Sequence, residues 1–360
     1  MLPSVLYVTD TRHGHCGWHD PSARHRCYHF AEALTANSYR CSVVHIERLT
    51  EKLVGQFQQV IFHRPKFSKR FLRAIEICNL RQVEVHADYD DLIFVPTLAS
   101  SSPLYINGNR PLNKVEAYFS DNRDALSYFD SVIVSTRALA SHIKSEFPVK
   151  FVTVLPNSLP RLFQEPSVAD PPGTGAGGAG ARVTGALNSE FTIGYFPGSN
   201  SHAHDVDMIR DALDNVFTAV PNCKLVVMGR MERGDLPLLA DSIELKPFVD
   251  YNRYLDQLAQ VDLSIAPLQN NIFNNAKSAV KLIESVAVGT PILASDNPDM
   301  RDHSNAMSAV VKDDAGWTDM LLKCVQGEAG FDCSEKEQLK GAYSVTSRLP
   351  ILKDLIGFAA

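Results

Sequence analysis

The chain has 360 residues, which corresponds to about two domains of ordinary size. Its composition, with 45% hydrophobic and 21% charged residues, is that of a globular protein. The 35 basic and 41 acidic residues give a net charge of -6, which argues against a general nucleic-acid binder, and no apolar run is long enough for a membrane-spanning helix.

The first half of the chain alternates strand-like and helix-like segments. A helix is predicted from about Ser22, which would serve as its N-cap. Strands are predicted at residues 4–9, 40–46, 60–62, 83–87, 131–134 and 151–155, and further helices at 69–78 and 137–147. Strands that alternate with helices predict βαβ units and a parallel sheet.

The alternation stops at residues 165–189, which are rich in glycine and proline. Six glycines lie between Gly173 and Gly185, behind two prolines. This composition predicts a linker or a disordered loop. A phosphate-binding glycine loop is the alternative, but no strand leads into the segment and no clear helix follows it.

The second half returns to the same alternation. Strands are predicted at 192–196, 224–228, 243–245, 263–266 and 291–295, and helices at 205–220, 251–260 and 277–288, with Gly289 as the residue that ends the last helix. The chain is thus predicted to be an α/β protein with two Rossmann-like, doubly wound domains that face a central cleft. The predicted parts are a first domain at 1–160, a linker at 161–189, a second domain at 190–335 and a C-terminal helical segment at 336–360 that packs back on the first domain.

Residues 273–284 (FNNAKSAVKLIE) are the strongest candidate for a binding site. We expect a helix to begin near Asn275, so that its unpaired amides and its dipole would suit a diphosphate. Lys277 lies in the first turn, where a cation is favourable if an anion is bound there. Lys277, Lys281 and Glu284 share one helix face, and an apolar neighbourhood indicates that Glu284 is partly buried. The alternative is a surface ion pair between Lys281 and Glu284.

Residues 86–91 (HADYDD) follow an apolar run and are expected at the carboxyl end of a strand. Three aspartates within four residues should raise the pKa of at least one of them, which suits a base or a sugar-binding group. We therefore expect catalytic roles for His86 and Asp88 and acceptor contacts for Asp90 and Asp91. A solvated acidic loop and a divalent-metal site, similar to the DxD motif of GT-A enzymes, are the alternatives.

Two further segments of the first half carry candidate groups. His13, His15, Cys16 and nearby residues have the side chains of a zinc site, but not its spacing, and a mobile glycine-containing loop is the preferred interpretation. Arg24 and Arg26 are expected to bind an anionic acceptor or the donor phosphate, unless they are simple surface arginines. Residues 64–73 mix cations with apolar side chains, as in a patch that contacts an anionic membrane surface, or as on an ordinary solvated helix.

Several segments resemble GT-B glycosyltransferases, in particular the family-4-like group that builds bacterial polysaccharides. In the second half the resemblance lies in residues 193–199 (IGYFPGS), 247–251 (PFVDY), 259–268 (AQVDLSIAPL) and 273–295. In the first half it lies in residues 22–34 (SARHRCYHFAEAL), 86–91, 135–139 (STRAL) and 154–157 (VLPN). The resemblance covers most of residues 4–158 and 191–300, and it is more specific in the second half.

The resemblance implies a transferase that takes a sugar from a nucleotide sugar, with retention of configuration, and transfers it to a saccharide or lipid-linked saccharide. Glu284 corresponds to the second glutamate of an EX7E motif, which binds the donor ribose, and Ala276 stands where the first glutamate, which contacts the donor sugar, would be. Lys277 is then the expected phosphate ligand and a catalytic residue with Glu284. The expected donor-binding residues are Gly198, Ser199, His202, Asn275, Lys277, Lys281 and Glu284.

The same resemblance implies that no metal cofactor is needed, since GT-B enzymes usually use helix dipoles and basic side chains instead. The odd, scattered set of seven cysteines, without a CxxC pair, favours a cytoplasmic location, and residues 64–73 would allow peripheral contact with the inner face of the membrane. The alternative functions are a GT-B-fold epimerase or phosphorylase and an inactive sugar-binding module. A dinucleotide-dependent oxidoreductase is disfavoured because no GxGxxG follows the first strand.

Overall fold

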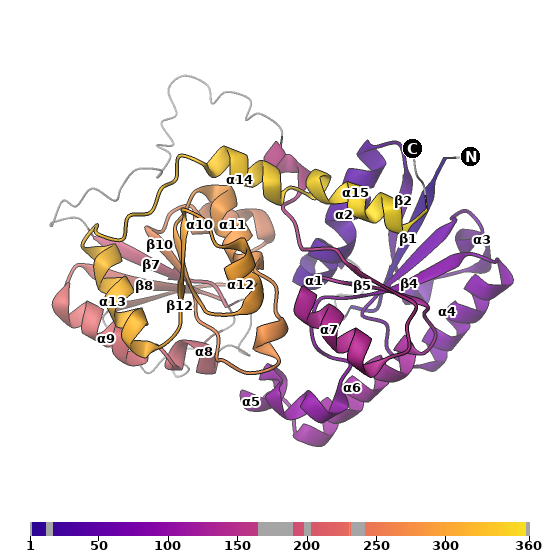
Figure 1. Cartoon of the computed structure of the whole chain (residues 1–360), viewed down its shortest axis with the longest axis horizontal. Coiled ribbons are helices and arrows are strands. Elements are labelled where there is room, and N and C mark those ends of the chain that lie inside the picture. The colour runs from indigo at the N-terminus through magenta and orange to yellow at the C-terminus, as the bar shows by residue number, and fades with distance from the viewer. Residues whose placement is uncertain are drawn as a thin grey trace.

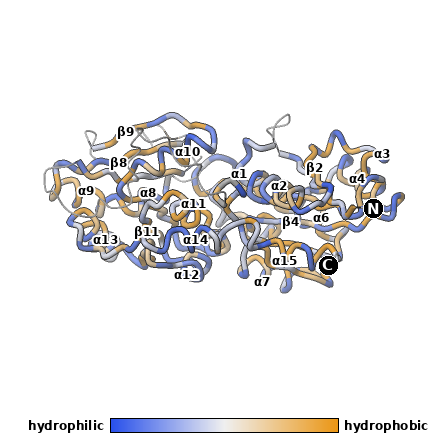
Figure 2. Tube along the Cα trace, turned by 90° about the horizontal axis from the view of Figure 1, so that it is seen from above, coloured by the Kyte–Doolittle hydropathy of each residue, from blue (hydrophilic) through white to orange (hydrophobic). Residues whose placement is uncertain are grey.

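The computed structural model describes residues 2–11, 17–164, 190–197, 203–229, 231 and 242–357. Within this range the chain forms two lobes, each with a parallel sheet between layers of helices (Figure 1). Viewed from above, the two lobes lie one beyond the other along the long axis of the molecule (Figure 2). Of the predicted linker at 161–189, residues 161–164 form a 3-10 turn and residues 165–189 lie outside the described range. The donor-site residues Gly198, Ser199 and His202 and the histidine-rich residues 12–16 also lie outside it.

The first domain holds a six-stranded sheet with the order β2-β1-β3-β4-β5-β6, in which all described neighbours pair in parallel. Its strands are β1 (Ser4–Thr9), β2 (Arg40–His45), β3 (Gln59–His63), β4 (Glu84–Tyr89), β5 (Ser131–Val134) and β6 (Phe151–Val154). Its helices are α1 (Pro21–Ala23), α2 (His29–Ala36), α3 (Glu51–Val54), α4 (Lys69–Leu80), α5 (Pro103–Ile106), α6 (Leu112–Leu126) and α7 (Arg137–Glu146), with a π-helical segment η2 (Arg24–Tyr28) between α1 and α2.

The second domain holds another six-stranded parallel sheet, with the order β12-β11-β10-β7-β8-β9. Its strands are β7 (Phe191–Tyr195), β8 (Cys223–Met228), β9 (Ile243–Lys246), β10 (Leu263–Ala266), β11 (Ile292–Ser295) and β12 (Ser308–Val311). Its helices are α8 (Ala203–Asp207), α9 (Arg210–Ala219), α10 (Tyr251–Leu258), α11 (Val280–Val288), α12 (Pro298–His303) and α13 (Asp314–Val325), and a short 3-10 turn η9 (Asn274–Ala276) precedes α11. The expected α/β fold with two doubly wound domains is confirmed.

The strand orders locate the ligand-binding edge of each sheet. In each sheet successive strands are added first on one side and then on the other. This change of side falls between β1 and β3 in the first domain and between β7 and β10 in the second. Ligands of doubly wound sheets bind outside the carboxyl ends of the strands at such points. In the first domain the register aligns Thr9 of β1 with His63 of β3, and His63 with Asp88 of β4, so these three residues share one edge.

Two helix starts differ from the sequence-based expectation. The first helix is capped by the Asp20 side chain, which accepts from the amide of Ala23, and Pro21 takes the first helical position. Ser22 is therefore inside the helix and its hydroxyl is free for other contacts. The helix predicted from about Asn275 begins only at Val280, because η9 and an extended Lys277 come first.

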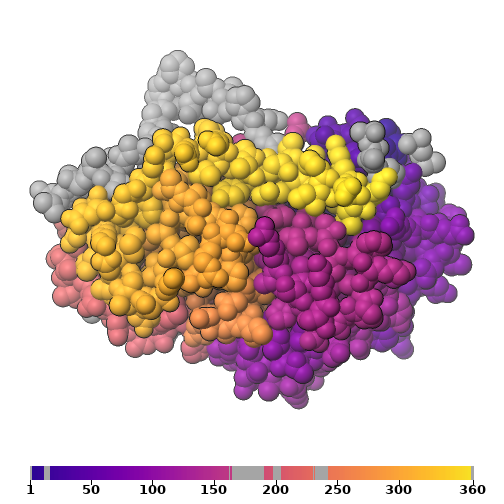
Figure 3. Space-filling view, viewed as in Figure 1, coloured from indigo at the N-terminus to yellow at the C-terminus, as the bar shows by residue number. Residues whose placement is uncertain are grey.

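The C-terminal helices α14 (Lys336–Tyr343) and α15 (Val345–Leu355) run across the top of both lobes (Figures 1 and 3). At their junction Ser344 forms a parallel bridge with Leu159, which lies on the segment that leaves the first domain. Beyond it, Val345, Leu349 and Leu352 are buried in one apolar cluster with Phe30 of α2. The last helix is therefore part of the core of the first lobe. Among the residues that the structure describes, no helix has the length and apolarity to cross a bilayer.

Candidate functional site

Glu284 of α11 lies at the junction of the two domains and is 2% exposed. Its Oε2 accepts hydrogen bonds from the Tyr254 hydroxyl (2.8 Å) and from Lys281 Nζ (3.3 Å). Its Oε1 lies 3.3 Å from Nε2 of His25, which belongs to the first domain. Burial by itself raises the pKa of Glu284. The charge of Lys281 and the contacts with His25 and Tyr254 together lower it by more, so the pKa lies below its ordinary value. The carboxylate is therefore ionised at neutral pH and is held by groups of both domains.

The π-helical segment of the first domain covers this carboxylate. The Arg24 guanidinium stacks 3.9 Å from the centroid of the Tyr251 ring, and its Nη1 donates to the Trp18 carbonyl at 3.3 Å. Its Nε is buried and has no hydrogen-bond partner among the described residues. Burial lowers the pKa of Arg24, and the charge of Glu284 partly opposes that shift. A buried cationic donor without a partner suits an anionic ligand at this junction, and the surface-arginine interpretation is wrong for Arg24.

Lys277 lies between the two domains in extended backbone just before α11. Burial lowers its pKa, while the charges of Asp205 and Asp91 raise it. No hydrogen bond of its ammonium group is found within the described ranges. Such a cation is available to an anion that binds between the two domains.

The expected diphosphate contact with amides near Asn275 is wrong. The amides of Asn275, Ala276 and Lys277 donate to the carbonyls of Asn271, Phe273 and Asn274. These amides are therefore not available to a ligand. At the start of α11 the Asp299 carboxylate caps the Ala279 amide at 2.7 Å, and the amides of Leu282 and Ile283 donate to the Ala279 carbonyl. The amides of Val280 and Lys281 have no such partner among the described contacts and are the donors left near Lys277.

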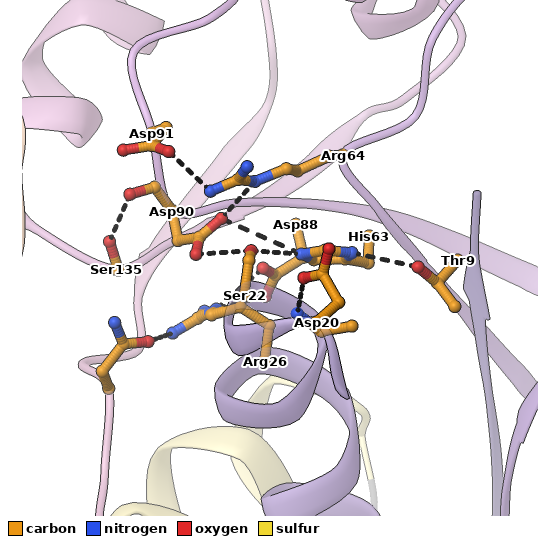
Figure 4. Close-up of polar contacts among 12 residues, drawn as sticks. Thr9, Asp20, Ser22, Arg26, His63, Arg64, Asp88, Asp90, Asp91 and Ser135 are labelled. Atoms are coloured by element: carbon orange, nitrogen blue, oxygen red, sulfur yellow. Dashed lines mark hydrogen bonds and ion pairs between the residues drawn. The ribbon is translucent and has the colours of Figure 1, made fainter. Parts of the chain in front are cut away.

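The first domain holds a polar network at the carboxyl ends of β1, β3 and β4 (Figure 4). The Ser22 hydroxyl donates to Asp90 Oδ2 at 2.6 Å and lies 2.7 Å from His63 Nε2. Since its proton is used on Asp90, the Ser22 oxygen accepts from Nε2, which leaves His63 Nδ1 to accept from Thr9 Oγ1 at 3.3 Å. Arg64 Nε donates to Asp90 Oδ1 at 2.6 Å, so Asp90 has partners on both oxygens.

The crowding of aspartates separates the pKa values of two neighbours. Burial raises the pKa of Asp91, Arg64 opposes this, and the charge of Asp90 adds to it, with a net upward shift. For Asp90 burial also raises the pKa, but Arg64, His63 and the hydrogen bonds from Arg64 and Ser22 together outweigh it, and the net shift of the pKa is downward. Burial lowers the pKa of His63, so its imidazole is neutral at neutral pH.

Arg26 and Asp88 are both buried in the first domain. They form a buried pair with two parallel bonds of 2.8 Å, and Arg26 Nη1 also donates to the Leu155 carbonyl (2.6 Å) and to Asn157 Oδ1 (3.0 Å). Asn157 in turn donates to Ser278 Oγ of the second domain at 2.8 Å. Since Arg26 is 1% exposed and its donors are used, the expected acceptor contact is wrong for Arg26, and the catalytic role expected for Asp88 is wrong because its carboxylate is occupied.

The catalytic role expected for His86 is also wrong. Strand β4 continues to Tyr89, so His86 lies within the strand and not at its carboxyl end. Its ring bonds the Ser131 hydroxyl (2.9 Å) and Gln59 Oε1 (2.8 Å) in the interior of the sheet. His86 is 1% exposed and holds neighbouring strands together.

Four residues of the site were not predicted from the sequence. His63 and Arg64 follow the strand at 60–62 directly, so their place at a carboxyl strand end was a usable signal. His25 and Tyr254 gave no sequence signal, because what places them in the site is their contact with Glu284, which is distant in the sequence.

The part of the chain that the structure describes brings no three histidine, cysteine or acidic side chains together as a cation site.

Acid should weaken the fold through Glu284. Its pKa lies below the ordinary 4.5, so its ion pairs stabilise the native state above about pH 4.5, and this contribution is lost as the pH falls toward the lowered value. We expect the thermal midpoint of the wild type to fall more steeply between pH 5 and pH 3 than that of Glu284→Gln, as measured by circular dichroism. Parallel curves would contradict an ionised, paired Glu284.

A second glutamate cannot simply be restored at position 276. Ala276 is 1% exposed and packs with Phe273 against the core of the first domain, while its carbonyl accepts from Thr136 Oγ1 at 3.0 Å. We expect Ala276→Glu to lower stability by about 1–2 kcal/mol through overpacking and to lower activity. Ala276→Ser is the matched control, and a gain of activity in Ala276→Glu without a loss of stability would contradict this packing.

Comparison with known proteins supports the fold and the class of enzyme. Residues 191–326 match the family model described as glycosyl transferases group 1. A search of curated protein sequences finds no match to the chain. HepE from Anabaena, solved in complex with UDP, shares 11% identity over 99% of this chain and 100% of its own, with a TM-score of 0.62. WaaG, a glycosyltransferase involved in lipopolysaccharide biosynthesis, shares 11% identity over 99% and 100%, with a TM-score of 0.63.

The fold is also shared with enzymes of another activity. A protein from Listeria monocytogenes, named as a candidate UDP-N-acetylglucosamine 2-epimerase, shares 11% identity over 100% of this chain and 98% of its own, with a TM-score of 0.58. At this identity the structural matches establish the fold alone, and the family model carries the activity. Together they identify the protein as a glycosyltransferase of GT-B fold with a group 1 domain at residues 191–326.

Proposed function

We propose that the chain transfers a sugar, with retention, from a nucleoside-diphosphate sugar to a hydroxyl of a saccharide acceptor in the synthesis of a surface polysaccharide. The observation that carries the proposal is the buried, ionised Glu284 at the domain junction, with the cations Lys281 and Arg24 near it and with Lys277 on the segment that leads into the same helix. A carboxylate accepts hydrogen bonds from ribose hydroxyls, and the cations compensate the charge of a diphosphate.

UDP is the nucleotide that we propose first, because HepE and other structures of the same fold were solved with UDP. The ribose would bind Glu284 with or in place of His25, and the diphosphate would bind Lys277 and the start of α11. Contacts from Gly198, Ser199 and His202 remain part of the proposal. These groups would stabilise the leaving diphosphate, and the proposal includes no metal cofactor.

The acceptor would enter along the first domain, where Arg24 and the Asp90 network line the cleft, and we propose that a lipid carries it. The supporting observation is α4 and the residues before it, where Phe67 is 37% and Leu72 is 36% exposed beside Lys69, Arg70 and Arg73. Such a mixed surface can contact anionic lipids. The proposed location is accordingly the cytoplasm, with peripheral contact to the inner face of the membrane.

The direct test is a transfer assay with labelled UDP-, GDP- and dTDP-sugars, with and without lipid extracts that contain saccharide acceptors. We expect one donor to release its nucleotide and to pass its label to the extract. Release that does not depend on any acceptor, with no labelled product, would contradict the proposed transfer.

Epimerisation of a nucleotide sugar is the second candidate, because the Listeria protein has the same fold. Proton NMR of the donor incubated without acceptor separates the two functions. An epimerised donor would support the second candidate, whereas an unchanged donor that is consumed only with acceptor supports transfer.

A further inference from the structure

The carboxylate of Glu284 is covered on every side that the structure describes. Its side chain is 3% exposed, and both of its oxygens have hydrogen-bond partners. The partners of Oε2, Tyr254 and Lys281, belong to the second domain, as Glu284 itself does. The partner of Oε1 is His25 of the first domain. A ribose therefore reaches Glu284 only when one of these covering groups gives way.

The His25 ring is held by little except its bond to Glu284. A carboxylate can only accept, so Nε2 of His25 donates to Oε1, at 3.3 Å, which is longer than the about 2.7–2.9 Å of a strong bond to a charged group. Its Nδ1 is buried and has no hydrogen-bond partner within the described ranges. The ring otherwise packs edge-on against His29 and Tyr251, with centroids 4.9 and 5.9 Å away. A better donor can therefore replace His25 on Oε1.

The backbone that carries His25 is fixed to the first domain. The next residue, Arg26, donates two bonds of 2.8 Å to Asp88 and further bonds to the Leu155 carbonyl and to Asn157. These bonds hold the segment η2 on its own sheet and keep His25 next to Glu284. A nucleotide that enters the junction thus competes with a partner that is already in place within the same molecule.

We propose that His25 is an internal competitor of the nucleotide, which occupies the Glu284 oxygen that a ribose hydroxyl would bind and so sets the affinity of the site. The inference rests on the proposed function, in which Glu284 binds the ribose. A hydroxyl donates to a carboxylate oxygen at about 2.5–2.7 Å, so binding exchanges the long bond from His25 for a shorter one. The apparent Kd equals the intrinsic Kd divided by the fraction of molecules in which Oε1 is free.

The same contact gives His25 a role between turnovers. A buried carboxylate oxygen that loses its donor costs free energy. When the nucleoside diphosphate leaves, His25 returns to Oε1 and keeps this oxygen paired. The exchange therefore weakens the binding of the nucleotide product and favours its release.

The test is titration calorimetry with UDP, or with whichever nucleoside diphosphate the protein binds. For His25→Ala we expect the Kd to fall about 10-fold, the lower end for a hydrogen bond to a charged group. His25→Gln is the matched rescue variant, since its amide can donate in place of Nε2, and its Kd should stay within about twofold of the wild type. Binding that is seen only in His25→Ala would support the inference as well.

Arg137→Ala is the control for a general loosening of the two domains. Arg137 of α7 is exposed and pairs with Asp302 of α12 at 3.2 Å, so the variant removes a contact between the domains that does not involve Glu284. Its Kd should stay within about twofold of the wild type.

The outcomes separate this inference from the proposed function. A Kd of His25→Ala that equals or exceeds that of the wild type would overturn the competition, and so would an equal gain in His25→Gln or in Arg137→Ala. In each of these results the protein still binds a nucleotide, and the proposed function stands. Failure of both the wild type and His25→Ala to bind any nucleoside diphosphate would overturn the proposed function as well.

A second measurement decides the question if His25→Ala does not fold. Imidazole proton–nitrogen correlation spectra of the wild type report the His25 ring directly, with its signals assigned by their absence from His25→Gln. We expect these signals to shift on saturation with the nucleotide, while those of His142 on α7 stay unchanged. His25 signals that do not respond to the bound nucleotide would overturn the inference.

Discussion

The variant Glu284→Gln is expected to lower kcat/KM by about 100-fold, with most of the loss in nucleotide affinity. The substitution keeps the shape of the side chain but removes the charge. A glutamine amide has a single accepting oxygen, so it cannot accept from Tyr254 and Lys281 on one side and from a ribose hydroxyl on the other. A hydrogen bond to a charged group contributes about 1.5–3 kcal/mol, which corresponds to about 10- to 150-fold. The measurement is steady-state kinetics with the donor identified by the transfer assay.

The matched control is Glu337→Gln, in which an exposed carboxylate of α14 that pairs with Lys340 is changed in the same way. It should leave kcat/KM within twofold. Kinetics of Glu284→Gln that equal those of the control would remove Glu284 from the site. A loss confined to folding is detected by the melting temperature of each variant.

The variant Arg26→Met is expected to destabilise the first domain by about 3–5 kcal/mol. It leaves the buried carboxylate of Asp88 without its two guanidinium bonds, and breaking a buried ion pair from one side costs about this much. It also removes the bond to Asn157, through which the pair is connected to Ser278 of the second domain. Urea unfolding followed by circular dichroism measures the loss.

A double substitution distinguishes the buried pair from the packing around it. Arg26→Met/Asp88→Leu removes both charges, and we expect it to recover a large part of the stability. Arg70→Met is the control, since Arg70 pairs with Glu47 on the surface and should cost only a small fraction of the loss. A loss in Arg26→Met no larger than in Arg70→Met would contradict the account of Arg26 as a structural residue.

The sequence allowed the strands to be predicted because parallel strands in α/β folds are short, continuous apolar runs between polar loops. The predicted run at 263–266 coincides with β10, and the run at 4–9 with β1. Helix starts were less predictable. The first helix begins at Pro21 because Asp20, and not Ser22, caps it, and the helix after Lys277 begins at Val280 because 3-10 turn η9 takes up residues 274–276.

The site was predictable only where a single segment carries it. Glu284 and Lys281 share one helix, and their proximity follows from their spacing. The structural roles of Arg26 and His86 depend on partners that are distant in the sequence. Arg26 bonds to Asp88, which is 62 residues away, and to the Leu155 carbonyl, which is 129 residues away. No local pattern shows that such an arginine is buried, so its assignment to a substrate was an error of missing tertiary contacts.

The strand end at 83–87 shows how a small boundary error changes a functional prediction. Because β4 extends to Tyr89, the first four residues of the HADYDD segment belong to the strand, and Asp90 and Asp91 follow its carboxyl end. The shift moves the candidate carboxylates from Asp88 to its neighbours. It also accounts for the place of His63, which pairs with Asp88 in the strand register and belongs to the polar network at this end of the sheet.

The central claim, that the junction around Glu284 binds a nucleoside diphosphate, is tested most directly by thermal melts with UDP, GDP, dTDP and CMP on the wild type and Glu284→Gln. A ligand at about 100 times its Kd adds about 2.7 kcal/mol to the stability of the native state, which is several degrees for domains of this size. We predict a shift of this order with one nucleotide in the wild type and a much smaller one in Glu284→Gln. A wild type that melts cooperatively at the same temperature with every nucleotide, or an equal shift in both proteins, would contradict the account.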